Sequence, residues 1–268
     1  PCAMLNTSPA DTTQTAHATD SAATRLAAVK RRICEACEAV GRPADSVSLL
    51  AVSKTWEASR VRELAALGQV AFGENYLQEA LAKIADCAAA QSATAGPVPL
   101  QWHFIGPIQS NKTRPIAEHF HWVHSIERGK IAARLSEQRP EPLPPLQVCV
   151  QVNVSGEASK SGCAPEEAVA LALAVARLPR LHLRGLMAIP EPTDDMTLQR
   201  ARFAALRGLF EEIASALNGQ DRQAADRFDT LSMGMSDDLE AAIAEGATIV
   251  RVGTALFGRR PVAIRPLP

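Results

Sequence analysis

The stretch VSLLAVSKTWEASRVRELAAL, residues 47–67, contains the pattern that decides the fold of this chain. Its first part, Val47–Ser53, is a short apolar run typical of a buried strand. Its last part, Ser59–Leu67, has the length and the composition of a helix, and a polar turn joins the two. The same order of strand, turn and helix repeats to the end of the folded chain.

Eight apolar runs are predicted strands. They are Val47–Ser53, Val70–Phe72, Gln101–Ile105, His121–Val123, Leu146–Asn153, Leu181–Met187, Phe228–Leu231 and Thr248–Val252. The helices between them are expected at Ser59–Leu67, Tyr76–Ala88, Lys112–Glu118, Arg128–Gln138, Pro165–Leu178, Met196–Leu217 and Asp237–Glu245, with a short turn from Thr254. Alternating strands and helices make a parallel sheet, because a hairpin cannot join parallel neighbours. Eight units predict an α/β fold, a (β/α)8 TIM barrel, rather than an open sheet.

An additional amphipathic helix, Ala22–Val40, is expected before the first strand. We predict a single barrel domain over residues 21–268, preceded by a disordered polar tail over residues 1–20. The proline-rich stretch at residues 139–145 resembles a linker, but it falls between the fourth helix and the fifth strand, which favours a stiff loop.

The composition excludes several classes of partner. The chain has 28 basic and 29 acidic side chains and a formal charge of -1, so no overall field attracts it to nucleic acid or anionic lipid. It contains no apolar run long enough to cross a membrane and no secretion signal, so we expect a cytoplasmic protein. Its six cysteines are scattered, which indicates reduced thiols. Only six of the 28 basic residues are lysines, so the position of each lysine is informative.

Lys54 follows the first predicted strand, at the end of a barrel where active sites are built. Burial there would lower the pKa of the amine and prepare it to form a Schiff base with an aldehyde. The alternative is a lysine that reaches solvent and pairs with a carboxylate such as Glu74.

The loops after the last two strands resemble a phosphate site. Barrels often bind phosphate there, through backbone N–H groups at a helix start, glycines and hydroxyl side chains. Residues 232–236, Ser-Met-Gly-Met-Ser, follow the seventh strand, and Gly253 and Thr254 follow the eighth. The alternative is that Ser236 and Thr254 only cap helices. We expect Ser236 to be a helix cap in either case.

Arg251 is two residues before Gly253 and therefore points to the same interior face of the barrel. A buried arginine needs an acceptor. That acceptor is either a pyridine ring nitrogen, which would then stay unprotonated, or a carboxylate such as Glu74.

Three smaller signals suggest other sites. His103, His119, His121 and His124 lie close in sequence, so a metal site is conceivable, but an ordinary polar junction between helix and strand is favoured. Cys34 and Cys37 form a CxxC pattern on a predicted helix, which favours packing over redox chemistry. Lys160 follows the fifth strand and either contacts an anion or remains solvated.

Seven segments in order resemble one protein family. They are AVSKT, FGENYLQEA, WHFIGPIQSNK, VNVSGEASKSG, LRGLMAIP, LSMGMSDDLEAAI and VRVGTALFG, within residues 49–258. The chain resembles the pyridoxal-phosphate homeostasis protein family, which is similar to the barrel domain of alanine racemase.

The resemblance implies a barrel that binds pyridoxal 5'-phosphate (PLP) through a Schiff base on Lys54. It implies phosphate contacts at Ser232, Gly253 and Thr254, with Ser236 nearby. It implies that Arg251 faces the ring nitrogen. It places Asn75 and His103 in the pocket and Met187 near the ring. No catalytic residue and no metal ligand is expected.

We expect a carrier or regulator of PLP rather than an enzyme. Racemisation needs a second acid/base opposite the lysine, which a tyrosine of an additional domain supplies in the racemases. The chain ends soon after Gly258 and its single tyrosine, Tyr76, is in the second unit. A weak racemase is the alternative. The resemblance implies transient transfer of PLP to apo-enzymes, and we expect a monomer that binds neither nucleic acid nor membrane.

Overall fold

A computed structural model describes residues 21–92, 99–156 and 161–258. The predicted tail over residues 1–20 and Lys160 lie outside the described residues.

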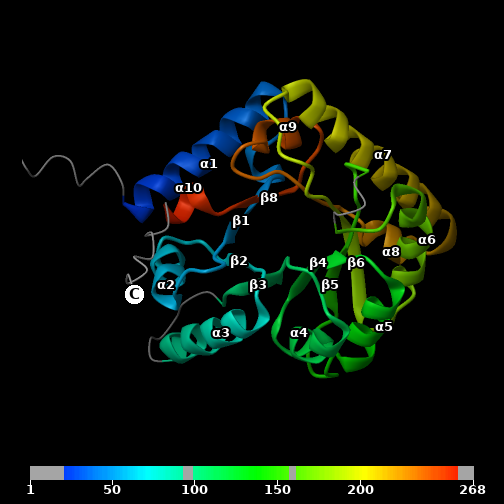
Figure 1. Ribbon diagram of the computed structural model, residues 1–268, viewed down its shortest axis with the longest axis horizontal. Coiled ribbons are helices and arrows are strands. Elements are labelled where there is room, and N and C mark those ends of the chain that lie inside the picture. Colours follow the sequence, from blue (N-terminus) through cyan, green and yellow to red (C-terminus); the bar gives the residue numbers. More distant parts are fainter. Residues whose placement is uncertain (1–20, 93–98, 157–160, 259–268) are drawn as a thin grey trace, which may run out of the picture.

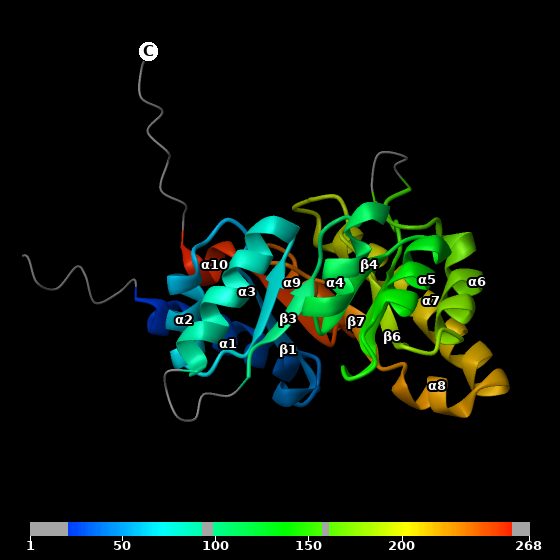
Figure 2. The same cartoon turned by 90° about the horizontal axis from the view of Figure 1, so that it is seen from below.

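Eight parallel strands form a closed barrel in which each strand pairs with the next along the chain and β1 pairs with β8 (Figures 1 and 2). The strands are β1 (Ser48–Val52), β2 (Ala71–Glu74), β3 (Gln101–Phe104), β4 (Trp122–Ile126), β5 (Leu146–Gln151), β6 (Leu181–Met187), β7 (Thr230–Ser232) and β8 (Ile249–Val252). The predicted TIM barrel is confirmed.

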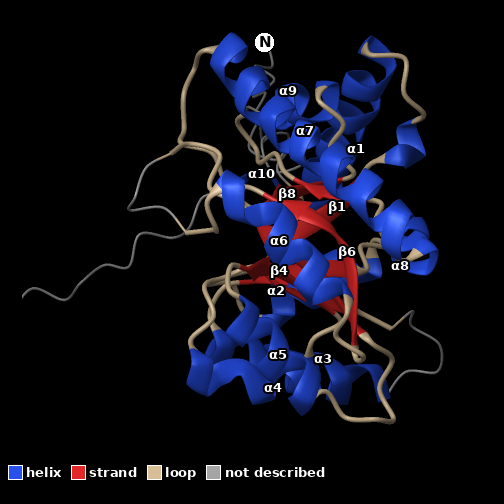
Figure 3. Cartoon of the chain, turned by 90° about the vertical axis from the view of Figure 1, so that its right-hand side faces the viewer, coloured by secondary structure: helices blue, strands red, loops and turns tan. Residues whose placement is uncertain are grey.

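Helices surround the barrel, as the blue ribbons around the red strands show (Figure 3). They are α1 (Ala22–Ala39), α2 (Ala58–Ala66), α3 (Leu77–Ser92), α4 (Thr113–His119), α5 (Gly129–Gln138), α6 (Pro165–Ala176), α7 (Met196–Gln220), α8 (Arg222–Arg227), α9 (Leu239–Ala244) and α10 (Thr254–Phe257), with short 3₁₀ turns η1 (Ala44–Ser46) and η2 (Ser110–Lys112). None of the helices in the described residues combines the length and the hydropathy needed to span a membrane.

The two faces of the barrel wall are chemically different, because successive side chains of a strand point to opposite faces. The outward face joins the large hydrophobic core under the helices, as with Phe72 and Trp102, whose ring centroids are 5.9 Å apart. The inward face holds a small apolar cluster of Leu50, Val52 and Ile249 with Ile105, which directly follows β3. The interior also contains buried polar groups, which the site below uses.

Two boundaries predicted from the sequence are wrong: the end of the fourth strand and the start of the helix that follows the seventh strand. Strand β4 extends to Ile126, although the sequence predicts an end at Val123, because polar His124 and Ser125 interrupt the apolar run. Ser236 does not cap a helix: α9 begins at Leu239, and Asp238 takes the cap position. The loop turns first at Gly234, whose φ of +93° suits glycine, and this delays the helix by two residues.

Candidate cofactor site

A cavity of about 320 Å³ opens at the carboxyl ends of the strands. Its lining combines apolar side chains with two amides and a hydroxyl, from Asn75, Ile105, Pro107, Gln151, Ser161, Ile189, Pro190, Pro192 and Met235. Of the residues predicted to bind a cofactor, Asn75 lines this cavity. Its side-chain oxygen Oδ1 is buried and has no hydrogen-bond partner. An unpaired buried acceptor of this kind can bind a ligand donor.

Lys54 lies directly after β1 at this end of the barrel, and its side chain is half-buried. The carboxylate of Glu74 pairs with another amine: Lys83 Nζ is 2.6 Å from Glu74 Oε1, and both side chains are buried. The alternative of a Lys54–Glu74 pair is therefore wrong. No group in the described residues forms a hydrogen bond or ion pair with the Lys54 amine, which leaves the amine available for chemistry.

A buried polar network holds the loop that carries Lys54. Lys83 Nζ donates to the carbonyl oxygen of Ser53 at 2.7 Å and to Glu79 Oε1 at 2.8 Å. Glu79 Oε1 also accepts a hydrogen bond from the backbone N–H of Thr55 at 2.5 Å. Thr55 has a φ of 67°, an uncommon conformation for a β-branched residue. The residues on both sides of Lys54 are thus tied to helix α3.

Arg251 projects from β8 into the barrel and is 3% exposed. Its Nη1 donates to the carbonyl and hydroxyl oxygens of Ser232, and its Nη2 donates to the carbonyl oxygen of Ala188 at 2.8 Å. Burial lowers the pKa of Arg251 to about 10, so the group is cationic at neutral pH. Among the described residues no carboxylate lies within ion-pair distance of it, which excludes the Glu74 alternative. A buried cation with neutral acceptors favours an electron-rich ligand atom beside it.

Two histidines continue the polar network beneath Arg251. Ser232 Oγ is 2.7 Å from His124 Nδ1, and His124 Nε2 is 2.9 Å from His103 Nδ1. Burial lowers the pKa of His103 to about 3 and the pKa of His124 well below its usual value. Both rings are therefore neutral at physiological pH, and one nitrogen on each is a donor while the other is an acceptor.

Sequence reasoning missed His124 and Lys83 as parts of this end of the barrel. His124 follows the predicted end of the fourth strand at Val123, so the sequence pattern favours a junction between helix and strand there. The alternation of Trp122 and His124 with buried Val123 is the sequence pattern that indicates a longer fourth strand. Lys83 lies inside a predicted helix, and nothing in its local sequence indicates that it reaches the barrel wall.

The two loops that are predicted to bind phosphate follow adjacent strands, β7 and β8. Arg251 N donates to the carbonyl oxygen of Gly234 at 2.9 Å, so the loop after β7 lies against β8. Gly253 packs close to β1, because an added Cβ would lie 3.3 Å from the carbonyl oxygen of Val52. Helix α10 begins at Thr254 and presents its N-terminal end at this edge. The Ser232 hydroxyl points inward to His124 instead.

The remaining predicted residues are spread over the barrel interior. Met187 is buried at the end of β6. His103 is on β3 and lines a different cavity, at the amino ends of the strands. No cluster of three or more histidine, cysteine, aspartate or glutamate side chains suited to a metal ion occurs in the part of the chain that the structure describes.

Known proteins resemble this chain in sequence and in fold. The family model for the N-terminal domain of alanine racemase matches residues 24–261. The pyridoxal phosphate homeostasis protein of Pseudomonas aeruginosa is 63% identical over 238 residues, which cover 89% of this chain and 95% of that protein. This chain belongs to the pyridoxal phosphate homeostasis protein family. The Escherichia coli K12 member is 50% identical and covers 88% of this chain and 95% of its own length.

Solved structures agree with this family assignment. PipY of Synechococcus elongatus with PLP bound has a TM-score of 0.71 and 36% identity, and covers 89% of this chain and 100% of its own. Alanine racemase from Corynebacterium glutamicum has a TM-score of 0.61 at 17% identity and covers 91% of this chain and 62% of its own, which shows the shared fold.

Proposed function

We propose that this protein binds PLP and acts in PLP homeostasis as a carrier rather than as an enzyme. Its relatives are named for this role, and PipY has been solved with PLP bound. When bound, PLP supplies an aldehyde carbon that an unprotonated primary amine attacks with loss of water.

Each predicted residue has a defined task in this proposal. Lys54 supplies the amine, and Lys83 holds the carbonyl oxygen of the preceding residue, Ser53. Thr254 and Gly253 hold the phosphate through backbone N–H groups and a hydroxyl, with Ser236 in the neighbouring loop. Arg251 donates to the ring nitrogen, Asn75 Oδ1 accepts from the ligand, and Met187 packs near the ring. Ser232 and His103 act from beneath, through the hydrogen bonds described above.

The buried guanidinium of Arg251 is the observation that carries the proposal. It lies at the same end of the barrel as the unpaired Lys54 amine, and its protein acceptors are neutral oxygens. An arginine cannot give up its proton to a pyridine nitrogen, so the ring nitrogen beside it stays unprotonated. The cofactor is then a weak electron sink, which suits storage better than catalysis.

The test is PLP titration of the purified protein and of Lys54→Ala, followed by borohydride reduction and peptide mass mapping. The wild-type protein is expected to turn yellow and to carry reduced cofactor on Lys54. The Lys54→Ala protein is expected to stay colourless. The Lys112→Ala protein is the control, since Lys112 is in η2 outside the site. Reducible PLP on Lys54→Ala at wild-type stoichiometry would show that the lysine is wrong.

Weak amino-acid racemisation is the second candidate function, favoured by the shared fold with alanine racemase. It needs an acid/base opposite Lys54. The single tyrosine, Tyr76, directly precedes α3 and is 56% exposed. We expect turnover of L-alanine far below about 1 per second, an ordinary enzyme rate. Loss of optical purity measured by polarimetry at or above that rate would refute the carrier role.

The carrier role also implies apo-enzymes as transient partners. The proposal extends to a monomer in the cytoplasm, supported by a barrel that closes within one chain and by free thiols at Cys34, Cys37, Cys87, Cys149 and Cys163. Mixing the PLP-loaded protein with an apo-transaminase and following the return of its activity tests the transfer. Reactivation no faster than with an equal concentration of free PLP would argue against it.

A further inference from the structure

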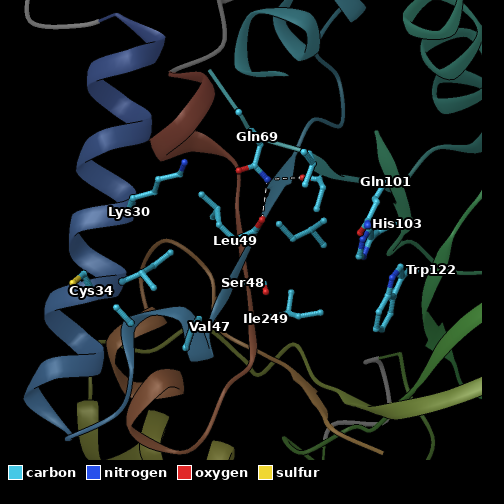
Figure 4. A pocket seen from close by; sticks show the side chains of 16 residues that line it. Lys30, Cys34, Val47, Ser48, Leu49, Gln69, Gln101, His103, Trp122 and Ile249 are labelled. Carbon is cyan, nitrogen blue, oxygen red and sulfur yellow. Dashed lines mark hydrogen bonds between the residues drawn. The ribbon is translucent and has the colours of Figure 1, made fainter. Parts of the chain in front are cut away.

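A second cavity, of about 470 Å³, lies at the amino ends of the strands, opposite the cofactor site. It extends from helix α1 and the start of β1 into the bottom of the barrel. We call it the basal cavity; it is lined by Lys30, Ile33, Cys34, Ala44, residues 47–50, residues 68–71, Gln101, His103, Trp122 and Ile249. Figure 4 shows Lys30 on one side of it and His103 with Trp122 on the other.

The walls of the basal cavity are mainly apolar and fixed. Leu50 and Ile249, on the inward face of the barrel, line its inner part, and Leu49, on the outward face of β1, lines its part near α1. Gln69 Nε2 donates to the carbonyl oxygens of Leu49 and Ala71 at 2.9 and 2.8 Å, which holds the amide against the wall. A molecule in this cavity therefore needs an apolar body to replace water.

The inner end of the basal cavity carries an unpaired polar atom. His103 is 3% exposed, and its Nε2 is buried without a hydrogen-bond partner. Its Nδ1 is occupied by His124 Nε2 at 2.9 Å, and the imidazole ring stacks on Trp122 with ring centroids 5.3 Å apart. Because His124 and Trp122 fix the imidazole ring, the unpaired Nε2 has a fixed position in which it can form a hydrogen bond with a ligand.

The outer end of the basal cavity carries a positive charge. Lys30 is the one charged side chain among the described lining residues, and no described residue forms an ion pair with it. The lining contains no carboxylate, so the local charge favours an anion.

From these features we infer that the basal cavity is a second ligand site, for a small organic carboxylate with an apolar body. The carboxylate lies at Lys30, the apolar body contacts Leu50 and Ile249 inside the barrel, and a polar group at the far end meets His103 Nε2. This inference goes beyond the proposed PLP role and does not depend on it, because Lys54 and Arg251 do not line this cavity.

The test is calorimetric titration of the full chain with two matched probes, 3-(4-hydroxyphenyl)propionate and its uncharged amide. In this proposal the hydroxyl of both probes meets His103. We expect a dissociation constant of about 1 mM or lower for the carboxylate, an ordinary affinity for a ligand of this size. The amide is expected to bind about threefold to fivefold more weakly, the size of a partly exposed charge interaction.

Three variants locate the binding. Lys30→Met should weaken the carboxylate about threefold to fivefold. Arg31→Met is the matched control on the same helix, because Arg31 pairs with Glu35 outside the cavity, and it should leave the affinity within about twofold. Ser48→Trp should abolish binding, since Ser48 is an exposed residue at the cavity wall where a large ring fits without disturbing the core.

Lys54→Ala separates this inference from the PLP proposal, because it should lose PLP and keep the probe affinity. The ¹⁵N signal of His103 Nε2, assigned from its absence in His103→Phe, should shift on addition of the carboxylate. No binding at about 10 mM probe, or equal effects of Lys30→Met and Arg31→Met, would overturn the inference. Binding that survives Ser48→Trp would overturn it as well.

Discussion

At the scale of single residues, the buried histidine pair makes stability depend on pH. The unfolded chain titrates His103 near pH 6.5, whereas burial lowers its folded pKa to about 3. Between these values the unfolded state binds more protons, so the free energy of unfolding falls as the pH falls. The contribution is fully present above pH 6.5 and is lost progressively below it. His124 shifts in the same direction.

We therefore expect acidification from pH 7 to pH 5 to reduce the free energy of unfolding by roughly 2 kcal/mol for His103 alone. Urea unfolding at pH 7, 6 and 5 measures this. In His103→Asn, the number of protons taken up on unfolding should fall by about one, so the free energy of unfolding should depend less on pH. The control is His119→Asn, on an exposed residue at the end of α4, which should keep the wild-type dependence. Equal slopes in wild type and His103→Asn would contradict the assignment.

The buried Lys83–Glu74 pair gives a second prediction at this scale. Lys83→Met leaves the Glu74 carboxylate buried without its cation, which should cost about 3–5 kcal/mol of unfolding free energy. Burial already raises the pKa of Glu74, against the opposing effect of Lys83. Lys83→Met should also weaken PLP binding about tenfold, because it removes the hydrogen bond that holds the Ser53 carbonyl group beside Lys54.

The double variant Lys83→Met/Glu74→Gln should recover most of the stability, since it removes the charge along with its partner. It should not recover the PLP affinity, because the Ser53 carbonyl group still lacks its Lys83 donor. Arg62→Met is the control, because Arg62 and Asp86 form an exposed pair at 3.0 Å that is expected to contribute less than about 1 kcal/mol. Urea unfolding and PLP titration measure the two effects. A double variant that regains the wild-type PLP affinity would refute the role of the Lys83–Ser53 hydrogen bond.

At the scale of elements, two glycines with opposite surroundings give a matched prediction. A Cβ at Gly185 in β6 would lie 1.7 Å from the carbonyl oxygen of Thr230, so Gly185→Ala must separate β6 from β7. We expect a loss of more than about 3 kcal/mol. Gly208 is exposed in the middle of α7 with nothing near its Cβ position, so Gly208→Ala should gain about 0.5–1 kcal/mol. Urea midpoints that move in the same direction for both variants would contradict this.

The elements also indicate what the sequence can and cannot predict. Strand β6 matches its prediction at both ends, because Leu181–Met187 is bounded by clear turn signals. Strand β4 does not, because its interior face is polar: His124 bonds to other buried groups, and apolar patterning cannot detect that. Helix α8 was not predicted, since its six residues fall between a long helix and a short strand.

The candidate site shows the same division between positions that the sequence predicts and contacts that it does not. Motif positions such as Lys54, Gly253 and Thr254 follow strand ends, and the fold brings them to one end of the barrel. The partners that tune them, Lys83 and His124, are distant in sequence from the groups they contact. Lys83 contacts Ser53 across 30 positions, and His124 contacts Ser232 across 108 positions. Such contacts between residues distant in sequence become visible only when the structure of the closed barrel is known.

At the scale of the whole molecule, α1 completes the ring of helices. The helix after β8 is α10, which has four residues and is too short to cover the outer face of its strand. Helix α1 packs against α9, α10 and α2 and contributes buried Leu26, Val29 and Ile33 to the main core (Figure 1). The additional N-terminal helix therefore takes the place of the eighth outer helix of the barrel.

Helix α1 also supports the proposed phosphate end of the cofactor site. Arg25 Nε donates to the carbonyl oxygen of Leu256 in α10 at 2.7 Å, and the side chain of Arg32 bonds to Glu240 and to the carbonyl oxygen of Ser236. A cationic side chain at the carboxyl end of a helix stabilises that helix. Loosening α1 should therefore affect the fold and the PLP affinity together.

Leu26→Ala tests this link. It should cost about 2–5 kcal/mol of unfolding free energy, because it leaves a cavity beneath α1, and it should weaken PLP binding by releasing α10. Arg31→Ala on the exposed face is the control and should change stability by less than about 0.5 kcal/mol. Hydrogen exchange should show early loss of protection in β1 and β8, which α1 covers, while β4 to β6 stay protected. A uniform loss of protection over all eight strands would mean that α1 does not unfold separately from the rest of the barrel.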